Sequence, residues 1–286
     1  MKKKTILIAG AGGFIGSALA ERLKGQNIIG AGRQDFAMDD HSFVNKYEPA
    51  DVIINFSGTP IMKRWTPKNR RKIMESRIET TRKLGLVPTR GMKKARRFIN
   101  ASAIGIYSEG GEHTENSYGK GTGFMKEVIE NWENEAMKIM SGECSVTVLR
   151  LGVVLSRNGG VIAKLLPIFR MGMGGRIGDG QQAFSWIHME DLLRAVEFIL
   201  EDDQKDGIYN MVSPGHCKNI DFTQQLAKAL NRPAFLGVPA TALKWIYGKG
   251  SEVVTKGQAV LPQRLMTEGF KFKYPDIKSA LREVVD

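Results

Sequence analysis

The sequence predicts an α/β protein built on a doubly wound parallel sheet, with a smaller carboxy-terminal α/β lobe. A continuous apolar run at residues 5–9 is typical of a strand buried on both faces of a parallel sheet. The helix that follows it carries Ile15, Leu19 and Leu23 on one apolar stripe. Strands and helices then alternate over the first two thirds of the chain, which is typical of parallel strands joined by right-handed crossovers.

A long basic helix is expected in the middle of this alternating region. Thr66 is its expected N-cap, and Pro67 occupies the first helical position, where the missing N–H costs nothing. Pro88 and Gly91 should end or kink this helix, and another helix is expected at 124–140. The other strands of the region are expected at 27–32, 51–56, 97–102 and 145–155.

The last third of the sequence is less regular, with a glycine-rich loop at 171–180 and an extended segment at 183–188. Asp191 should lie at the start of a helix that runs to residue 200. We therefore divide the chain into residues 1–155 and a lobe of residues 156–286 that partly completes the sheet. The lobe is expected to hold a strand at 207–212, a helix at 222–230 and a segment of shorter elements from about residue 233.

Composition excludes several classes of protein. The chain has 286 residues, 42% of them hydrophobic, which is enough for a sizeable core. No apolar run reaches the roughly 18 residues of a spanning helix, and the Met-Lys-Lys-Lys start does not resemble a signal peptide. Cys144 and Cys217 stand alone and the four histidines are scattered, so no metal site is expected. We expect reduced thiols, a cytoplasmic location and no contact with membranes.

The net charge of +12 raises the question of nucleic-acid binding. The basic residues are spread along the chain, and the densest group lies at 63–83, on the long basic helix and its approach. A solvated helix face explains this group first, and attraction of an anionic nucleotide or substrate explains it second. Nucleic-acid binding ranks third, because no basic patch interleaved with aromatic residues accompanies the charge.

Glycines at 10, 13 and 16 connect the first strand to the first helix. In a dinucleotide-binding turn of this kind, one glycine permits the tight turn, one lets a pyrophosphate approach the backbone, and one lets helix and strand pack closely. The N–H groups and the dipole of the helix start then favour an anion. The motif therefore predicts a Rossmann-type domain that binds a dinucleotide.

The end of the second strand bears on which nucleotide is bound. Arg33 stands there, where a carboxylate would select NAD and an arginine pairs with the ribose phosphate of NADP. The sequence therefore favours NADP(H), although Asp35, expected near the adenine edge, keeps NAD as an alternative. A methyltransferase that binds S-adenosylmethionine is disfavoured, because it generally has an acidic residue at the end of this strand.

Segments spread almost from end to end carry a family resemblance: GAGGFIG (10–16), NFSGTPI (55–61), RWTPKNRRKIMESRIETT (64–81), NASAIGIYS (100–108), ENWENEA (130–136), LRLGVVLSRNGG (149–160), GMGGRIGDGQQAFSWIHMED (172–191) and GFKFKYPDIKSAL (269–281). On these segments the chain resembles the atypical extended short-chain dehydrogenase/reductases labelled nucleoside-diphosphate-sugar epimerase, some of which are labelled cell-division inhibitors. The SRxxTT, WIHxxD and GFxFxYP pieces are specific to this branch.

The resemblance implies an NADP-binding Rossmann core with a carboxy-terminal lobe that closes over a cleft. It also implies roles for individual residues, carried over position by position. The pyrophosphate would be held at the glycine turn by Gly10, Gly13, Phe14, Ile15 and Gly16. The ribose phosphate would be held at the end of the second strand by Gly32 and Arg33. The adenine and ribose would lie beside Phe56, Ser57 and Gly58 after the third strand, and Arg77 would approach the cofactor from the side.

The catalytic pair of short-chain dehydrogenases is missing. Their Tyr-x-x-x-Lys helix supplies an acid/base tyrosine and a lysine that lowers its pKa, but this chain has Phe124 and Val128 at those positions. The sequence does contain one literal Tyr-x-x-x-Lys match, Tyr274 to Lys278, but it lies in the carboxy-terminal lobe, outside the strand–helix context that the pair requires. Ser102 matches the serine that orients the substrate oxygen. The candidate proton donors are Tyr107, Tyr118 and His188. A histidine at the position of His188 more often has a structural role, as a hydrogen-bond partner near the start of the following helix, than a catalytic one.

Two classes of function remain open on these residues. The first is an NADP(H)-dependent oxidoreductase or epimerase that acts on a nucleotide sugar or a similar small anionic metabolite. The second is an NADP(H)-binding protein whose catalysis has lapsed, acting as a sensor or interaction partner. Ser102 and the elaborate carboxy-terminal lobe favour the first class, while Phe124 and Val128 favour the second. The chain is expected to be a monomer or a homodimer.

Overall fold

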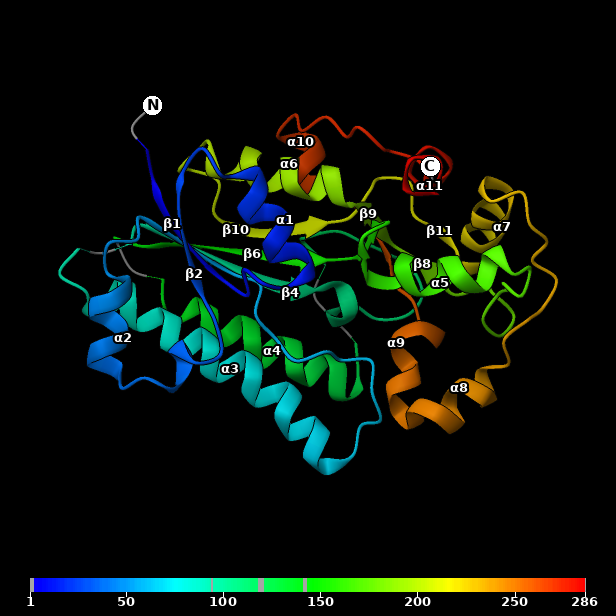
Figure 1. Cartoon of the computed structure of the whole chain (residues 1–286), viewed down its shortest axis with the longest axis horizontal. Coiled ribbons are helices and arrows are strands. Elements are labelled where there is room, and N and C mark those ends of the chain that lie inside the picture. The colour runs from blue at the N-terminus through cyan, green and yellow to red at the C-terminus, as the bar shows by residue number, and fades with distance from the viewer. Residues whose placement is uncertain (1–2, 94, 118–120, 141–142, 286) are drawn as a thin grey trace.

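Six parallel strands form the central sheet in the computed structural model, which describes residues 3–93, 95–117, 121–140 and 143–285. The sheet runs through the middle of the molecule, with helices on both faces (Figure 1). Every neighbouring pair in it is parallel, as the sequence predicted. Across the sheet the strands are β2 (Asn27–Ala31), β1 (Thr5–Ala9), β3 (Val52–Asn55), β4 (Arg97–Ala103), β6 (Ser145–Leu151) and β10 (Gly207–Met211).

The apolar run of β1 serves both faces of the sheet. Ile6 and Ile8 belong to a core shared with α1 (Phe14–Arg22) and α6 (Met189–Leu200). Leu7 and Ala9 point to the opposite core, because successive side chains of a strand alternate between faces. Helices α2 (Asp40–Tyr47), α3 (Pro67–Arg90) and α4 (Gly123–Met137) cover that second face.

Helix α3 begins and ends where the sequence predicted. The Thr66 side chain accepts a hydrogen bond from the Asn69 amide, and Pro67 is the first helical residue. The helix passes through Pro88 and ends at Arg90 with Gly91 as its C-cap, within the stretch where the sequence predicted its end. Pro88 lies in the last turn, so the one hydrogen bond that it removes, to the Leu84 carbonyl, weakens the helix only close to its end.

The carboxy-terminal lobe has its own hydrophobic core, at the right of Figure 1. Trp186, Phe222 and Leu281 are among its fully or almost fully buried side chains. The sheets of this lobe are short. The lobe and the segments next to it contain β5 (Glu112–His113) with β12 (Ala259–Val260), β7 (Val153–Ser156) with β9 (Trp186–His188), β8 (Ala183–Phe184) with β11 (Cys217–Lys218), and helices α5 (Gly160–Arg170), α7 (Asn219–Ala229), α8 (Ala240–Tyr247), α9 (Glu252–Thr255), α10 (Gln263–Thr267) and α11 (Ile277–Val285).

The strand expected at 145–155 is two strands in different sheets. It divides at Gly152, whose amide donates to the Met211 carbonyl. A Cβ on Gly152 would lie 2.7 Å from Val212 Cγ1 and 2.8 Å from the Ser185 carbonyl oxygen. The crowding at this glycine therefore comes from segments far along the chain, while β6 stays in the central sheet and β7 joins the lobe.

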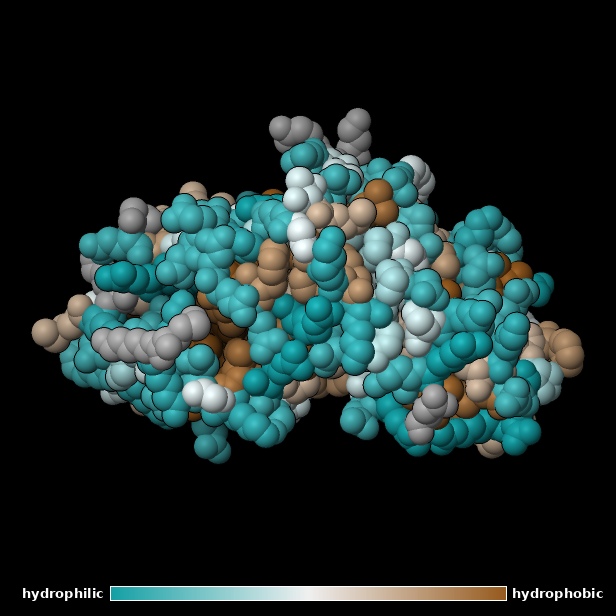
Figure 2. Space-filling view, turned by 90° about the horizontal axis from the view of Figure 1, so that it is seen from above, coloured by the Kyte–Doolittle hydropathy of each residue, from teal (hydrophilic) through white to brown (hydrophobic). Residues whose placement is uncertain are grey.

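The face that carries α1 and α6 is turned toward the viewer in Figure 2. Hydrophilic residues cover most of it, and hydrophobic colour is confined to smaller areas between them. Within the described residues, no helix combines the length and apolar character needed to cross a bilayer. The same residues contain no cluster of three or more His, Cys, Asp or Glu able to hold a metal ion.

Candidate functional site

The order of the strands creates a crevice between β1 and β3. From β1 the chain moves outward to β2 and then returns to place β3 on the other side of β1. In doubly wound sheets, ligands bind at such a switch point, outside the carboxyl ends of the strands. The turn after β1 and the segment after β3 both lie at this edge, so the fold places the predicted dinucleotide turn at a binding crevice.

The glycine turn after β1 depends on residues without a Cβ at two positions. Gly10 has φ +82°, and a Cβ there would lie 3.0 Å from the carbonyl carbon of Phe56. A Cβ on Gly16 would lie 2.1 Å from the Gly10 carbonyl oxygen. The expected tight turn and close helix–strand packing are therefore present in the structure.

Helix α1 starts at this turn with Gly13 as its N-cap. The Gly13 amide donates to the Gly10 carbonyl at 2.8 Å, so this N–H group is already used within the turn. The amides of Phe14 and Ile15 occupy the first helical positions, where no carbonyl of the helix can accept from them. Of the predicted pyrophosphate ligands, these two therefore offer the backbone donors.

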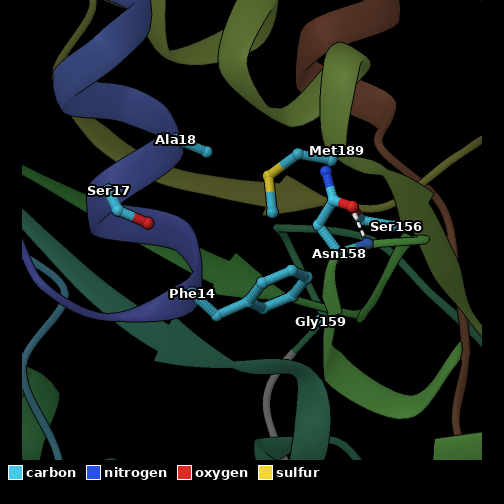
Figure 3. Close-up of a pocket in the computed structure, with 7 residues that line it drawn as sticks. All are labelled: Phe14, Ser17, Ala18, Ser156, Asn158, Gly159 and Met189. Atoms are coloured by element: carbon cyan, nitrogen blue, oxygen red, sulfur yellow. Dashed lines mark hydrogen bonds between the residues drawn. The ribbon is translucent and has the colours of Figure 1, made fainter. Parts of the chain in front are cut away.

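The Phe14 side chain borders a cavity of about 390 Å³ rather than the strand edge. Figure 3 shows its ring extending from the start of α1 toward Gly159. A Cβ on Gly159 would lie 2.2 Å from this ring, so Phe14 requires a glycine in the facing loop. The cavity thus joins the start of α1 to the lobe, and its lining is Phe14, Ser17, Ala18, Ser156, Asn158, Gly159 and Met189.

The turn after β2 exposes Arg33 and folds Asp35 back. Within the described residues, no hydrogen bond or ion pair occupies the Arg33 side chain, which is exposed. The Asp35 carboxylate accepts from the Gly32 amide at 2.7 Å and forms an ion pair with Lys46 at 2.5 Å. These contacts hold the pKa of Asp35 below its ordinary value, the Lys46 hydrogen bond having the larger effect. Arg33 is therefore available to a ligand, and Asp35 is already engaged.

The segment after β3 covers Arg77. Ser57 is tied to the Asn55 side chain through both its amide and its hydroxyl, and a Cβ on Gly58 would lie 3.3 Å from the Arg77 guanidinium. Arg77 donates to the carbonyls of Thr59 and Ile73, both at 3.1 Å.

No carboxylate is near enough to Arg77 for an ion pair in the part of the chain that the structure describes, and the guanidinium instead lies over the Trp132 ring. Burial without an opposite charge lowers the pKa of Arg77 to about 10. The side chain remains a cation at neutral pH. Arg77 is therefore a positive charge that the described protein does not neutralise.

Ser102 and Tyr107 belong to a buried network instead of an open site. The Ser102 hydroxyl donates to Glu133 at 2.5 Å, and Glu133 receives two hydrogen bonds from Arg150 at 2.9 and 2.8 Å. Arg150 also donates to the Tyr107 hydroxyl at 2.8 Å, which in turn donates to Asn210 at 2.9 Å. Neither hydroxyl can reach a ligand without breaking these contacts.

The geometry disfavours the expectation that Ser102 faces the cofactor, since this residue is 2% exposed and its hydroxyl is bound to Glu133. Tyr107 is 1% exposed, and burial raises its pKa. Burial alone would lower the pKa of Arg150, but the hydrogen bonds and charge of Glu133 more than offset this and raise it. A catalytic role for Ser102 or Tyr107 stays a prediction, and the geometry disfavours it.

Sequence reasoning missed the charged members of this network. Arg150 lies within an otherwise apolar strand, and Glu133 lies on a helix that packs against the sheet. A charge inside an apolar periodic segment indicates a buried partner, because an unpaired buried charge is costly. That signal could have linked the two residues before the structure was known.

The positions of the missing catalytic pair are apolar in space as well as in sequence. Phe124 and Val128 form a buried cluster with Ile73, and the Trp65 ring packs against Phe124 at 5.1 Å. Neither side chain can give a proton or bind a ribose hydroxyl, and the Arg70 guanidinium lies over the Phe124 ring, 4.4 Å from its centre. Tyr118, one of the three candidate donors, lies outside the described residues.

His188 has a structural part, as the sequence indicated. Its Nδ1 accepts from the Glu190 amide at 3.2 Å at the start of α6, and its Nε2 lies 2.6 Å from Glu283. Tyr274, from the literal Tyr-x-x-x-Lys match, packs against the His188 ring at 4.1 Å. Both residues therefore serve the contact between α6 and the end of the chain.

Comparison with protein families gives two matches along this chain. Residues 6–211 match the family described as the NAD dependent epimerase/dehydratase family. Residues 238–284 match a domain of unknown function, DUF1731. The first match covers all six strands of the central sheet, and the second covers the last part of the lobe.

Several relatives align over almost the whole chain. The Arabidopsis thaliana "Epimerase family protein SDR39U1 homolog, chloroplastic" is 35% identical, over 98% of this chain and 86% of that protein. The Mus musculus protein SDR39U1 is 32% identical, over 98% of this chain and 99% of its own. The crystal structure of human SDR39U1 with NADPH has a TM-score of 0.91 and 28% identity, covering 98% of each chain.

The fold is also found in more distant enzymes. The structure of UDP-glucuronic acid 4-epimerase from Bacillus cereus superposes with a TM-score of 0.79 at 18% identity, covering 98% of this chain and 97% of that one. At this identity the likeness concerns the fold alone.

Proposed function

Because this chain belongs to the NAD dependent epimerase/dehydratase family, we propose that it binds NADP(H) in the crevice between β1 and β3. The observation that carries the proposal is the pairing of a glycine turn, closed by Gly10 and Gly16, with an exposed and unpaired Arg33 at the end of β2. The human relative solved with NADPH supports the choice of nucleotide.

The chain's own groups fit such a ligand. The amides of Phe14 and Ile15 and the dipole of α1 would hold the diphosphate, with Gly10, Gly13 and Gly16 keeping side chains away from it. Arg33, beside Gly32, would bind the ribose phosphate. Phe56, Ser57 and Gly58 would border the adenosine half, with Arg77 approaching beneath Gly58. Bound NADP(H) would supply hydride transfer to or from a substrate carbon.

For the reaction, we propose an epimerase-like oxidoreductase that acts on a nucleotide sugar or a similar small anionic metabolite. The net charge of +12 supports an anionic substrate. The lobe borders the start of α1 through the cavity beside Phe14, where a substrate could approach the nucleotide. The proton donor for this reaction is not one of the usual pair.

A second function is favoured by the apolar cluster of Ile73, Phe124 and Val128. It replaces the usual tyrosine and lysine with groups that can neither give a proton nor bind a ribose hydroxyl. Ser102 and Tyr107 are also held by internal hydrogen bonds. These observations support a protein that binds NADP(H) without turnover and acts as a sensor or interaction partner.

Nucleic-acid and membrane partners are not part of the proposal. Several cations of the basic helix α3 are already paired with carboxylates, among them Arg70 with Glu127, Arg71 with Glu75 and Arg82 with Glu135. This pairing reduces the positive field that a phosphate backbone would meet. We propose a cytoplasmic monomer or homodimer.

Calorimetric titration of the whole chain with NADPH and NADH tests the nucleotide. We expect heat and a dissociation constant lower for NADPH, whereas no heat from either form would refute the proposed site. Turnover is tested by incubating the protein with stereospecifically deuterated NADPH and metabolite extracts. Loss of label into an anionic product supports the oxidoreductase, and retention of label across many extracts supports the lapsed enzyme.

A further inference from the structure

A tight turn at the end of β2 is fixed from both sides by one aspartate. The Asp35 amide donates to the Gly32 carbonyl at 3.1 Å, and the Gly32 amide donates to the Asp35 carboxylate at 2.7 Å. Arg33 and Gln34 therefore form the tip of the turn, where Arg33 is exposed. The second carboxylate oxygen of Asp35 meets Lys46 Nζ at 2.5 Å.

The position of this carboxylate matters for a nucleotide in the crevice. Chains that select NAD hold an acidic residue at the end of the second strand, about 20 residues beyond the glycine turn, where it accepts hydrogen bonds from the ribose hydroxyls. The Asp35 carboxylate lies against the backbone of Gly32, directly after the last residue of β2. It is therefore close to the place from which a free carboxylate would favour NAD and repel a ribose phosphate.

Lys46 is the one side chain that cancels this charge among the described residues. It lies in the last turn of α2, and within the described residues neither Lys46 nor Asp35 forms another ion pair. The Gly32 amide engages the other oxygen without neutralising it. With Lys46 in place, the turn presents the positive charge of Arg33, because the charges of Lys46 and Asp35 cancel.

We propose that Lys46 is a positioning residue that makes the crevice selective for NADP(H) by occupying and neutralising Asp35. The inference rests on the proposed function and goes beyond it, since it assigns part of the nucleotide preference to a residue on α2 that the motif at the strand end does not contain. Without Lys46, Asp35 would oppose the ribose phosphate and could accept hydrogen bonds from the free ribose hydroxyls of NAD(H).

The experiment measures dissociation constants of NADPH and NADH by calorimetry for a set of full-length variants. In Lys46→Met we expect the dissociation constant for NADPH to rise by about fivefold to tenfold at low salt, because an unscreened carboxylate then faces the ribose phosphate. The constant for NADH should stay equal or fall. Lys46→Arg should restore the preference, since it keeps the ion pair.

The double-variant cycle distinguishes an effect of Lys46 that acts through Asp35 from a direct contact between Lys46 and the ribose phosphate. In an Asp35→Asn background, which keeps an acceptor for the Gly32 amide, Lys46→Met should change the NADPH/NADH ratio by less than about twofold. Lys24→Met is the control, because it removes an exposed ion pair, 2.7 Å to Glu21, in the turn that follows α1. It should leave both dissociation constants unchanged.

The outcomes distinguish this inference from the function on which it rests. If the unmodified chain binds neither nucleotide, the proposed function fails and the inference with it. If Lys46→Met weakens NADPH and NADH equally, Lys46 only supports the turn and the inference is wrong. Lys46→Met could also reduce the preference for NADPH over NADH as strongly in the Asp35→Asn background as in the unmodified chain. Lys46 would then contact the ribose phosphate itself, and the proposed route through Asp35 would be overturned.

Discussion

The crevice beside β1 and the interior beside β4 differ in whether their charged side chains are paired with opposite charges. At the crevice, Arg33 is unpaired within the described residues, and Arg77 has no carboxylate to neutralise it there. At the interior, Glu133 and Arg150 satisfy each other and the hydroxyls of their neighbours. Cations left without an opposite charge indicate an anionic ligand, whereas a fully paired network indicates structure. The comparison separates the predicted cofactor residues from the predicted catalytic ones.

The largest expected effect comes from breaking the interior network. Glu133→Ala leaves Arg150 as a buried cation without its carboxylate, which should lower the free energy of unfolding by about 3–5 kcal/mol. Urea unfolding at pH 7 measures this loss. Glu130→Ala is the control on the same helix, because its pair with Lys126 is at the surface and should matter by less than about 1 kcal/mol. Equal effects of the two variants would show that the network is not structural.

The next largest effect is expected at the crevice, from a substitution in the glycine turn. In Gly16→Ala the new Cβ would meet the Gly10 carbonyl oxygen at 2.1 Å, so the glycine turn must shift away from α1. We expect a loss of about 1–3 kcal/mol in stability and at least a tenfold weaker binding of NADPH, or about 1.4 kcal/mol. Gly25→Ala is the control, because its Cβ would meet nothing within 4 Å. Unchanged NADPH binding by Gly16→Ala would argue against the crevice.

Arg77→Met should affect binding more than folding. Removing the cation should weaken NADPH binding by about tenfold, because the positive charge beneath Gly58 would no longer attract the anionic nucleotide. The unfolding free energy without nucleotide should fall by less than about 1 kcal/mol, since relief of the buried charge offsets two lost hydrogen bonds. Arg71→Met, on the exposed side of the same helix, serves as the control. A large stability loss with unchanged binding would make Arg77 structural.

The smallest effect is expected for Tyr107→Phe. The change removes the hydroxyl that joins Arg150 to Asn210, at a cost of about 1 kcal/mol in unfolding free energy. Binding of NADPH should be unchanged, as measured by calorimetry. A variant with normal stability and no turnover in the deuterium assay would instead restore Tyr107 as a catalytic residue.

Local features of the sequence predicted the amino-terminal half well. The strand at 5–9, the glycine turn and the capped start of α3 all depend on residues that are neighbours in the chain. The division at Gly152 depends on Val212 and Ser185, which approach it only in the folded protein. Sequence periodicity carries no information about such contacts between distant segments.

In the candidate site, too, the features set by neighbouring residues could be predicted, and those set by distant segments could not. Glycines and a strand-end arginine identify a nucleotide crevice because their roles are set by backbone geometry. The direction of the Ser102 hydroxyl is set by Glu133 and Arg150, which come from another helix and another strand. A serine at a strand end is therefore compatible with either a ligand or a buried carboxylate until the tertiary contacts are known.

The last strand of the central sheet has a consequence for how the chain reaches its folded state. Strand β10 pairs with β6, yet the entire segment of β7, α5, β8, β9 and α6 lies between them in sequence. A growing or truncated chain that stops near residue 155 would leave β6 as an uncovered edge, whose free backbone groups can pair with another molecule. Such a fragment should aggregate during expression, and the lobe thus protects the sheet by delivering its final strand.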